Sequence, residues 1–176
     1  SIRFDKSLAG GALMDVGCYC LNFSRAVTGE EPSEIHAISK RHESGVDEQT
    51  CVIARFPSGT AAEFTVGMRT QADNAAFVCG DEGYIRIPLP WKPPLGNGQV
   101  ILGRSTPPRQ DNPNVPAVTP PPMVYAIDDD RDLYGIEADA FAACVQDLAP
   151  AFITESDTMG NMRALDALRA RIGLAF

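Results

Sequence analysis

The sequence lacks the long apolar runs and the excess of positive charge on which two large classes of protein depend. No segment of its 176 residues approaches the roughly 20 consecutive apolar residues of a membrane-spanning helix, and residues 1–6 do not resemble a signal peptide. Fifteen Lys and Arg, scattered along the chain, stand against twenty-three Asp and Glu, which gives a net charge of −8. That charge repels nucleic acid. We therefore expect a soluble cytoplasmic protein that binds neither nucleic acid nor a membrane.

Cysteine and histidine are too few, and too poorly spaced, for a disulfide framework or a metal site. Five cysteines are an odd number in a chain long enough to build a core without bridges, which favours reduced thiols. Cys18 and Cys20 are one residue closer than a C-x-x-C pair, and we interpret them as buried or half-buried small residues. His36 and His42 have no third ligand near them in the sequence. No metal is therefore expected.

The hydrophobic periodicity predicts helices and strands in two different parts of the chain. We expect helices over residues 10–29, 134–148 and 156–174. Strands are expected over 34–43, 47–56, 60–69, 75–80, 84–89 and 123–127, with 99–102 as one more possible strand. Because the connections between successive strands are short, the pairing should be antiparallel. The prediction is an α+β fold in which three helices pack on one face of an open, mainly antiparallel β-sheet of six or seven strands.

Proline is concentrated in one segment, and acidic residues in another. Eleven of the fourteen prolines lie between Pro88 and Pro122. So long a loop either covers something or contacts a partner, or it is plain irregular surface, and the sequence leaves both interpretations open. The triplet 128–130 is three aspartates, but it lacks the spaced ligands of a calcium loop, so we predict a solvated turn.

The first predicted helix carries polar residues that could take part in chemistry. Asp15 and Tyr19 are four residues apart, so their side chains should lie on the same side of the helix. Gly10 and Gly11 open this helix, and glycine permits close approach of a backbone to a ligand. An ordinary amphipathic helix would often show the same pair.

Four segments and one tryptophan resemble a known family of enzymes. Residues 10–20 (GGALMDVGCYC) are similar to the Gly-Gly-x-Leu-x-Asp-[Ile/Val]-Gly-x-Tyr signature that opens the C-terminal domain of the Gfo/Idh/MocA oxidoreductases. Residues 40–47 (KRHESGVD), the Gly80-x-x-Gly83 turn and Trp91 resemble the branch with dihydrodiol dehydrogenases and NADP-dependent xylose dehydrogenases. Residues 161–167 (NMRALDA) are similar to the ending of the family.

The resemblance implies a two-domain enzyme, of which this chain matches one domain. The family has an N-terminal Rossmann domain that holds NAD(P) and a C-terminal domain whose open sheet usually makes the oligomer. Residues 1–176 would be the C-terminal substrate-binding and oligomerisation domain. The sequence has no G-x-G-x-x-G after a strand, and it lacks the family's catalytic lysine segment. We therefore expect NAD(P) in the full-length protein, and neither bound cofactor nor activity in this chain alone.

The resemblance also implies roles for individual residues. Tyr19 would be the proton donor and acceptor at the substrate, and Asp15 would orient the substrate or tune that proton transfer. Gly10 and Gly11 would let the helix start approach the nicotinamide, although simple capping by small residues is the alternative. Trp91 would wall the substrate pocket, or it plugs the edge of the core. A phenol has a pKa near 10, so as a base near neutral pH it needs a neighbouring cation, and the missing lysine would be the natural one.

Two functions follow, from different classes. The first is an NAD(P)-dependent dehydrogenase that transfers a hydride between nicotinamide and a small sugar or diol-type substrate. The alternative is a non-catalytic dimerisation or small-ligand-binding module. Residues 51–56 place apolar groups on both faces of their strand, so we expect a homodimer through the uncovered sheet face, with Arg41 as a candidate residue at its rim.

Overall fold

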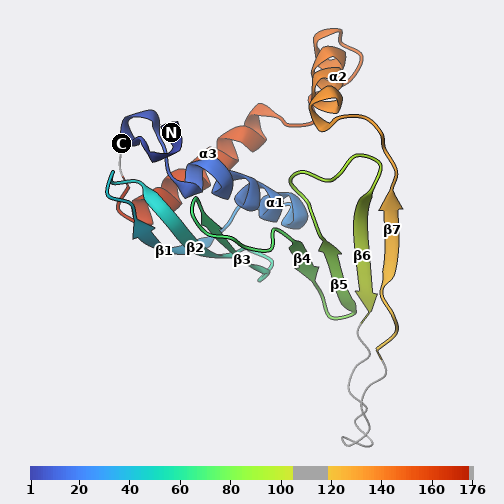
Figure 1. Cartoon of the computed structure of the whole chain (residues 1–176), viewed down its shortest axis with the longest axis horizontal. Helices are drawn as coiled ribbons and strands as arrows, with labels where there is room; N and C mark the ends of the chain where they lie inside the picture. The colour runs from blue at the N-terminus through green and yellow to red at the C-terminus, as the bar shows by residue number, and fades with distance from the viewer. Residues whose placement is uncertain (105–118, 175–176) are drawn as a thin grey trace, which may run out of the picture. The chain divides into compact units, whose positions relative to one another are not determined.

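The computed structural model describes residues 1–104 and 119–174, so residues 105–118 of the proline-rich segment lie outside the described residues. The chain divides into two compact units. The first unit is Ser1–Gln71 together with Phe152–Phe176, and the second is Ala72–Ala151. Figure 1 labels the elements of both units.

The first unit is a three-stranded antiparallel sheet with helices on one face. Its strands are β1 (Glu34–Arg41), β2 (Asp47–Arg55) and β3 (Ala61–Gly67), with β2 in the centre. Two 3-10 turns, Ile2–Phe4 and Lys6–Leu8, lead into a π-helical turn, Leu13–Gly17, which continues as α1 (Cys18–Thr28). The last element is α3 (Glu155–Arg171).

Local sequence signals explain where these helices begin and end. Gly29 ends α1 with a φ of 68°, the left-handed conformation that glycine adopts without strain. The hydroxyl of Thr154 caps α3 by accepting a hydrogen bond from the backbone N–H of Asp157 at 3.1 Å. The acidic first turn and basic last turn of α3 also suit its helix dipole.

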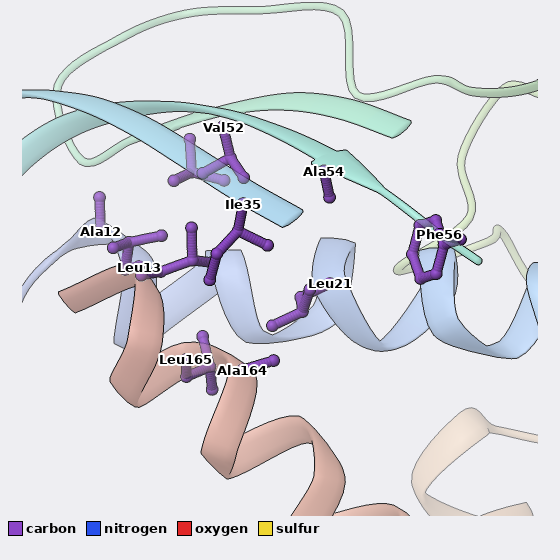
Figure 2. Close-up of a cluster of buried hydrophobic side chains, with 11 residues drawn as sticks. Ala12, Leu13, Leu21, Ile35, Val52, Ala54, Phe56, Ala164 and Leu165 are labelled. Carbon is purple, nitrogen blue, oxygen red and sulfur yellow. The ribbon is translucent and has the colours of Figure 1, made fainter. Parts of the chain in front are cut away.

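The core of the first unit lies between the sheet and the two helices. Figure 2 shows Leu13 and Leu21 directed between the strands and α3, where Leu165 meets them. The inner side chains of β2, Val52 and Ala54, are at most 2% exposed. The full cluster of buried residues is Ala12, Leu13, Leu21, Ile35, Val52, Ala54, Phe56, Val66, Ala164, Leu165 and Leu168. This packing holds α1 and α3 against one face of the sheet.

The second unit is a four-stranded antiparallel sheet followed by a helix. Its strands are β4 (Ala76–Cys79), β5 (Gly83–Ile87), β6 (Gly98–Arg104) and β7 (Met123–Ile127), paired in that order. The helix is α2 (Leu133–Val145), which has no buried residue. Among the described residues of this unit, only Gly98 and Gly103 are buried.

The predicted α+β class, with open antiparallel pairing and three helices, is confirmed. The seven strands form two hydrogen-bonded sheets rather than one, because β3 pairs with β2 and β4 pairs with β5, and these two edge strands do not pair with each other. The possible strand at 99–102 is real and longer than expected. Helices α1 and α3 cover one face of the first sheet, whereas α2 belongs to the second unit. None of the helices within the described ranges has the length and apolar character needed to cross a bilayer.

Candidate functional site

The two glycines at the start of the first helix are needed by contacts inside the chain. A side chain at Gly10 would collide with the carbonyl oxygen of Arg3, and the N–H of Gly11 donates to that same oxygen at 2.9 Å. Gly11 has a φ of +124°, which side-chain-bearing residues rarely adopt, and a methyl group there would collide with a carboxylate oxygen of Asp47. The glycine pair therefore lets the N-terminal segment and β2 approach the helix start.

The predicted carboxylate lies in a rare type of helical turn. Asp15 is the central residue of the π-helical turn Leu13–Gly17, and such turns occur frequently at functional sites. Its backbone N–H donates to the carbonyl of Gly11 at 3.0 Å. The Asp15 side chain accepts a hydrogen bond from Nε of Arg3, also at 3.0 Å, and it is 27% exposed. The ion pair gives this carboxylate one orientation at the surface.

Tyr19 follows in the first turn of α1, and 59% of it is exposed. A phenol in that position can meet a ligand from solvent. It lies on the same continuous segment as Gly10, Gly11 and Asp15, and the joint role of these four residues stays a prediction. Trp91 follows β5 in the second unit and is 36% exposed.

Two residues of this site were not found by sequence reasoning. Arg3 forms the ion pair with Asp15, and Asp47 lies beneath Gly11 with an exposure of 1%. Arg3 lies outside every predicted element. Asp47 was noted as the first residue of a strand and as the last residue of the 40–47 segment that resembles the family, and that segment was the available signal.

The cysteines near the site are not suited to act as nucleophiles. Burial raises the pKa of the Cys18 thiol, and burial raises the pKa of Cys20 to about 11. Both are half-buried, in agreement with the prediction. A high pKa leaves a thiol protonated at neutral pH and therefore unreactive.

The remaining polar candidates have partners within the first unit. His36 is paired with the carboxylate of Glu34 at 2.8 Å, and Nδ1 of His42 lies 3.0 Å from the hydroxyl of Ser44. Across the described part of the chain, no three His, Cys, Asp or Glu side chains are grouped so that they could hold a metal ion. The guanidinium of Arg41 donates to backbone carbonyls of Gly45 and Ile172, so it connects the β1–β2 turn to the end of α3.

The acidic turn of the second unit is held by a local ion pair. Hydrogen bonds from Arg131 lower the pKa of Asp129 to about 2, and the shortest of them is 2.6 Å. Asp128 and Asp130 are exposed and residues 128–130 form no helix or strand, which agrees with the prediction of a solvated turn.

A backbone N–H at the helix start is bonded within the chain. A helix start can bind a phosphate through its free backbone N–H groups. Here the N–H of Leu13 donates to the carboxylate of Asp47 at 2.9 Å, so a negative group of the chain itself takes that place. That N–H is therefore not available to a phosphate group, while the phenol of Tyr19 in the first turn of α1 is exposed.

The first half of the chain, which includes the helix start, is similar to a known protein family. The model of the family described as GFO/IDH/MocA C-terminal domain matches residues 1–86, the part that contains all of β1, β2 and β3 and the Gly-Gly segment. Among curated proteins, the bovine trans-1,2-dihydrobenzene-1,2-diol dehydrogenase is 40% identical over 91 residues, and the human enzyme of that name is 37% identical over 91 residues. These matches cover 51% of this chain but only 27% of each relative. The matched part thus spans about a quarter of the relatives' length.

Solved structures show the same fold over nearly the whole chain. An aldose-aldose oxidoreductase from Caulobacter crescentus, complexed with glycerol, has a TM-score of 0.75 at 22% identity and covers 97% of this chain and 48% of its own. A 3-ketoreductase from Actinomadura kijaniata, in complex with NADP and TDP-benzene, has a TM-score of 0.77 at 21% identity, with 98% and 49% covered. At these identities the likeness concerns the fold.

Proposed function

We propose that this chain is the substrate-side domain of an NAD(P)-dependent dehydrogenase for a sugar or diol-type substrate. The premise is that the chain belongs to the Gfo/Idh/MocA oxidoreductases, whose C-terminal domain it matches. The names of the relatives support this substrate class: one group acts on a dihydrobenzene diol, and one structural neighbour is an aldose-aldose oxidoreductase. The five unpaired cysteines support a cytoplasmic location. The dinucleotide would bind mainly to another domain of the longer protein.

The observation that carries the proposal is the exposed phenol of Tyr19, four residues along the same helical segment from a carboxylate that is paired with Arg3. Oxidation of an alcohol to a carbonyl releases a hydride, which the nicotinamide accepts, and a proton, which a residue of the enzyme must take. Tyr19 takes that proton from the substrate hydroxyl and returns it to the carbonyl oxygen in the reverse direction. Asp15, oriented by Arg3, binds a neighbouring hydroxyl of the substrate or tunes the proton transfer.

Replacement of Tyr19 by phenylalanine in the full-length enzyme tests this role. Tyr19→Phe keeps the ring and removes the titrating hydroxyl, so turnover should fall roughly 100-fold to 10,000-fold. Asp15→Asn should have a smaller effect and should shift the pH profile of kcat. Tyr134→Phe, at a tyrosine on α2 that is 67% exposed, is the matched control and should keep full turnover. Near-normal turnover of Tyr19→Phe, with the chemical step shown to be rate-limiting, would favour the non-catalytic module instead.

A second proposal concerns assembly, and uncovered apolar side chains support it. On the face of β2 away from the helices, Ile53 is 59% exposed, and Ile38 on β1 is 81% exposed. In the second unit, the register places Val78, Ile85, Leu102 and Met123 side by side across all four strands. Apolar sheet faces of this kind mark surfaces that another molecule covers. We infer that a second copy of this chain covers such a face in a homodimer with two-fold symmetry.

Light scattering distinguishes the possible interfaces. The chain at micromolar concentration should give about twice its mass of 18.9 kDa. Ile53→Lys tests the face of the first sheet, and Ile85→Lys tests the face of the second. The variant whose lysine lies in the interface should give the monomer mass. Met162→Lys, on the outer side of α3, is the control and should remain dimeric. A monomer for the unmodified chain, or a dimer that only Met162→Lys disrupts, would refute an interface through the sheet.

A further inference from the structure

The carboxylate of Asp47 is buried at the first position of β2, where no role was expected for it. Burial of a charge is unfavourable unless the charge is paired and hydrogen-bonded. One oxygen of Asp47 accepts a hydrogen bond from the backbone N–H of Leu13 at 2.9 Å and another from the hydroxyl of Thr50 at 2.8 Å. The central strand of the sheet thus binds the first turn of the helix that carries Asp15 and Tyr19.

The other oxygen of Asp47 is fitted against Gly11. The left-handed backbone of Gly11 and the absence of a side chain there leave room for that oxygen. Asp47 and the second glycine of the Gly-Gly pair are therefore complementary. If either changes, the start of the helix must move relative to β2.

A second polar side chain holds the other end of the same turn. The amide nitrogen of Asn161, on α3, donates to the backbone carbonyl of Cys18 at 3.2 Å. Cys18 is the residue at which the π-helical turn passes into α1, and its own N–H bonds back to the carbonyl of Leu13. The turn that contains Asp15 is thus bound at its start from β2 and at its end from α3.

We propose that Asp47 and Asn161 are positioning residues, which together hold the π-helical turn Leu13–Gly17 in the register that directs Asp15 and Tyr19 toward substrate. Neither touches the reacting atoms, and the catalytic part of this inference rests on the proposed function. A π-helical turn is less regular than an α-helix, so without the two side chains it is free to return to α-helical register. That change would rotate Tyr19 relative to Asp15.

Two isosteric variants of the full-length enzyme test the inference. Asp47→Asn removes the charge and one acceptor at the start of the turn, and Asn161→Asp replaces the donor to Cys18 by an acceptor. Each should lower kcat by about 10-fold to 100-fold, the size of effect expected from a small misplacement of a catalytic group, with an unchanged KM for the nicotinamide cofactor. Each should also shift the pH profile of kcat. The control is Leu168→Ala, at a fully buried residue of α3. It should lower the melting temperature and leave kcat and its pH profile unchanged.

A spectroscopic measurement on the chain itself separates this inference from the proposed function. In ¹H–¹⁵N spectra, Asp47→Asn should move the Leu13 amide resonance and those of residues 11–19, whereas Leu168→Ala should not move them selectively. If Tyr19→Phe keeps its turnover but the Leu13 amide resonance moves in Asp47→Asn, the proposed function fails and the two-ended attachment of the turn stands. If Asp47→Asn and Asn161→Asp lower only the melting temperature, as Leu168→Ala does, the positioning role is overturned.

Discussion

The two units of this chain are built from the same kinds of element, but they bury their apolar side chains differently. Every buried hydrophobic residue among those described belongs to the first unit, where α1 and α3 cover one face of the sheet. In the second unit, three large side chains of α2, Tyr134, Phe141 and Val145, are 66% to 70% exposed. The first unit is thus stabilised by its own core, whereas the second has apolar surface that remains free to bind another surface.

This difference agrees with the position of the candidate site. A catalytic group must be held within a fraction of an ångström, and only a packed core gives that rigidity. The turn with Asp15 begins at Leu13, which is completely buried. The second unit, by contrast, offers the area that an interface needs.

The largest expected effect is that of cavity formation in the first unit. Leu165→Ala, at a fully buried position on α3, should lower the free energy of unfolding by about 2–5 kcal/mol. Phe141→Ala removes a larger side chain from α2, but it should change the stability by less than about 0.5 kcal/mol because Phe141 is mostly exposed. Urea unfolding of both variants at concentrations where the chain is monomeric checks the difference. Equal losses would mean that the second unit has a core of its own.

A smaller effect is expected from one ion pair in each unit. The hydrogen bond from Arg25 holds the pKa of Glu31 below its usual value, and the buried Arg25 also binds Asp157 on α3 at 3.0 Å. A carboxyl group with a lowered pKa stabilises the folded state above its unfolded pKa, near 4.3, and this stabilisation is lost as the pH falls through the folded pKa. Glu31 is half-exposed, so Glu31→Gln should cost no more than about 1 kcal/mol at pH 7. The difference in stability between Glu31→Gln and the unmodified chain should disappear at acidic pH.

The matched variant in the second unit is Asp129→Asn. Asp129 and Arg131 are two residues apart in an exposed turn, so the pair joins no separate elements and solvent screens it. Despite the low pKa of Asp129, the midpoint of unfolding of Asp129→Asn should match that of the unmodified chain at each pH between 3 and 7. Thermal melts of both variants across this range make the comparison. A larger loss for Asp129→Asn than for Glu31→Gln would contradict it.

The smallest signal is expected from nucleotide titration of the chain by itself. Neither unit has a dinucleotide fingerprint in its sequence, and Asp47 occupies the helix start of the first unit. Calorimetry with NADH or NADPH should therefore give no binding heat. A micromolar dissociation constant for either would show that this chain holds more of the cofactor site than its sequence indicates.

Local sequence patterns were sufficient to predict most elements. In β3, the alternation of apolar and polar residues correctly places Val66, 5% exposed, toward the helices, and Glu63 and Thr65 toward solvent. The helix that carries Tyr19 was expected over 10–29, and the structure ends it at the predicted glycine. Such patterns are reliable because the periodicity of a helix or strand depends only on neighbouring residues. The same patterns indicated Asp15 and Tyr19, whose roles remain a prediction.

The sequence by itself determined the helices, the strands, their antiparallel pairing and the family signature at residues 10–20. Tertiary structure alone decided that the seven strands divide into two sheets, that Asp15 lies in a π-helical turn, and that Arg3 and Asp47 belong to the site. The reason is the distance along the chain between interacting groups. Asp47 meets Leu13 across 34 residues, and Asn161 meets Cys18 across 143, so no local pattern records either contact. Only the packing of β2 and α3 around one helix start brings these groups together.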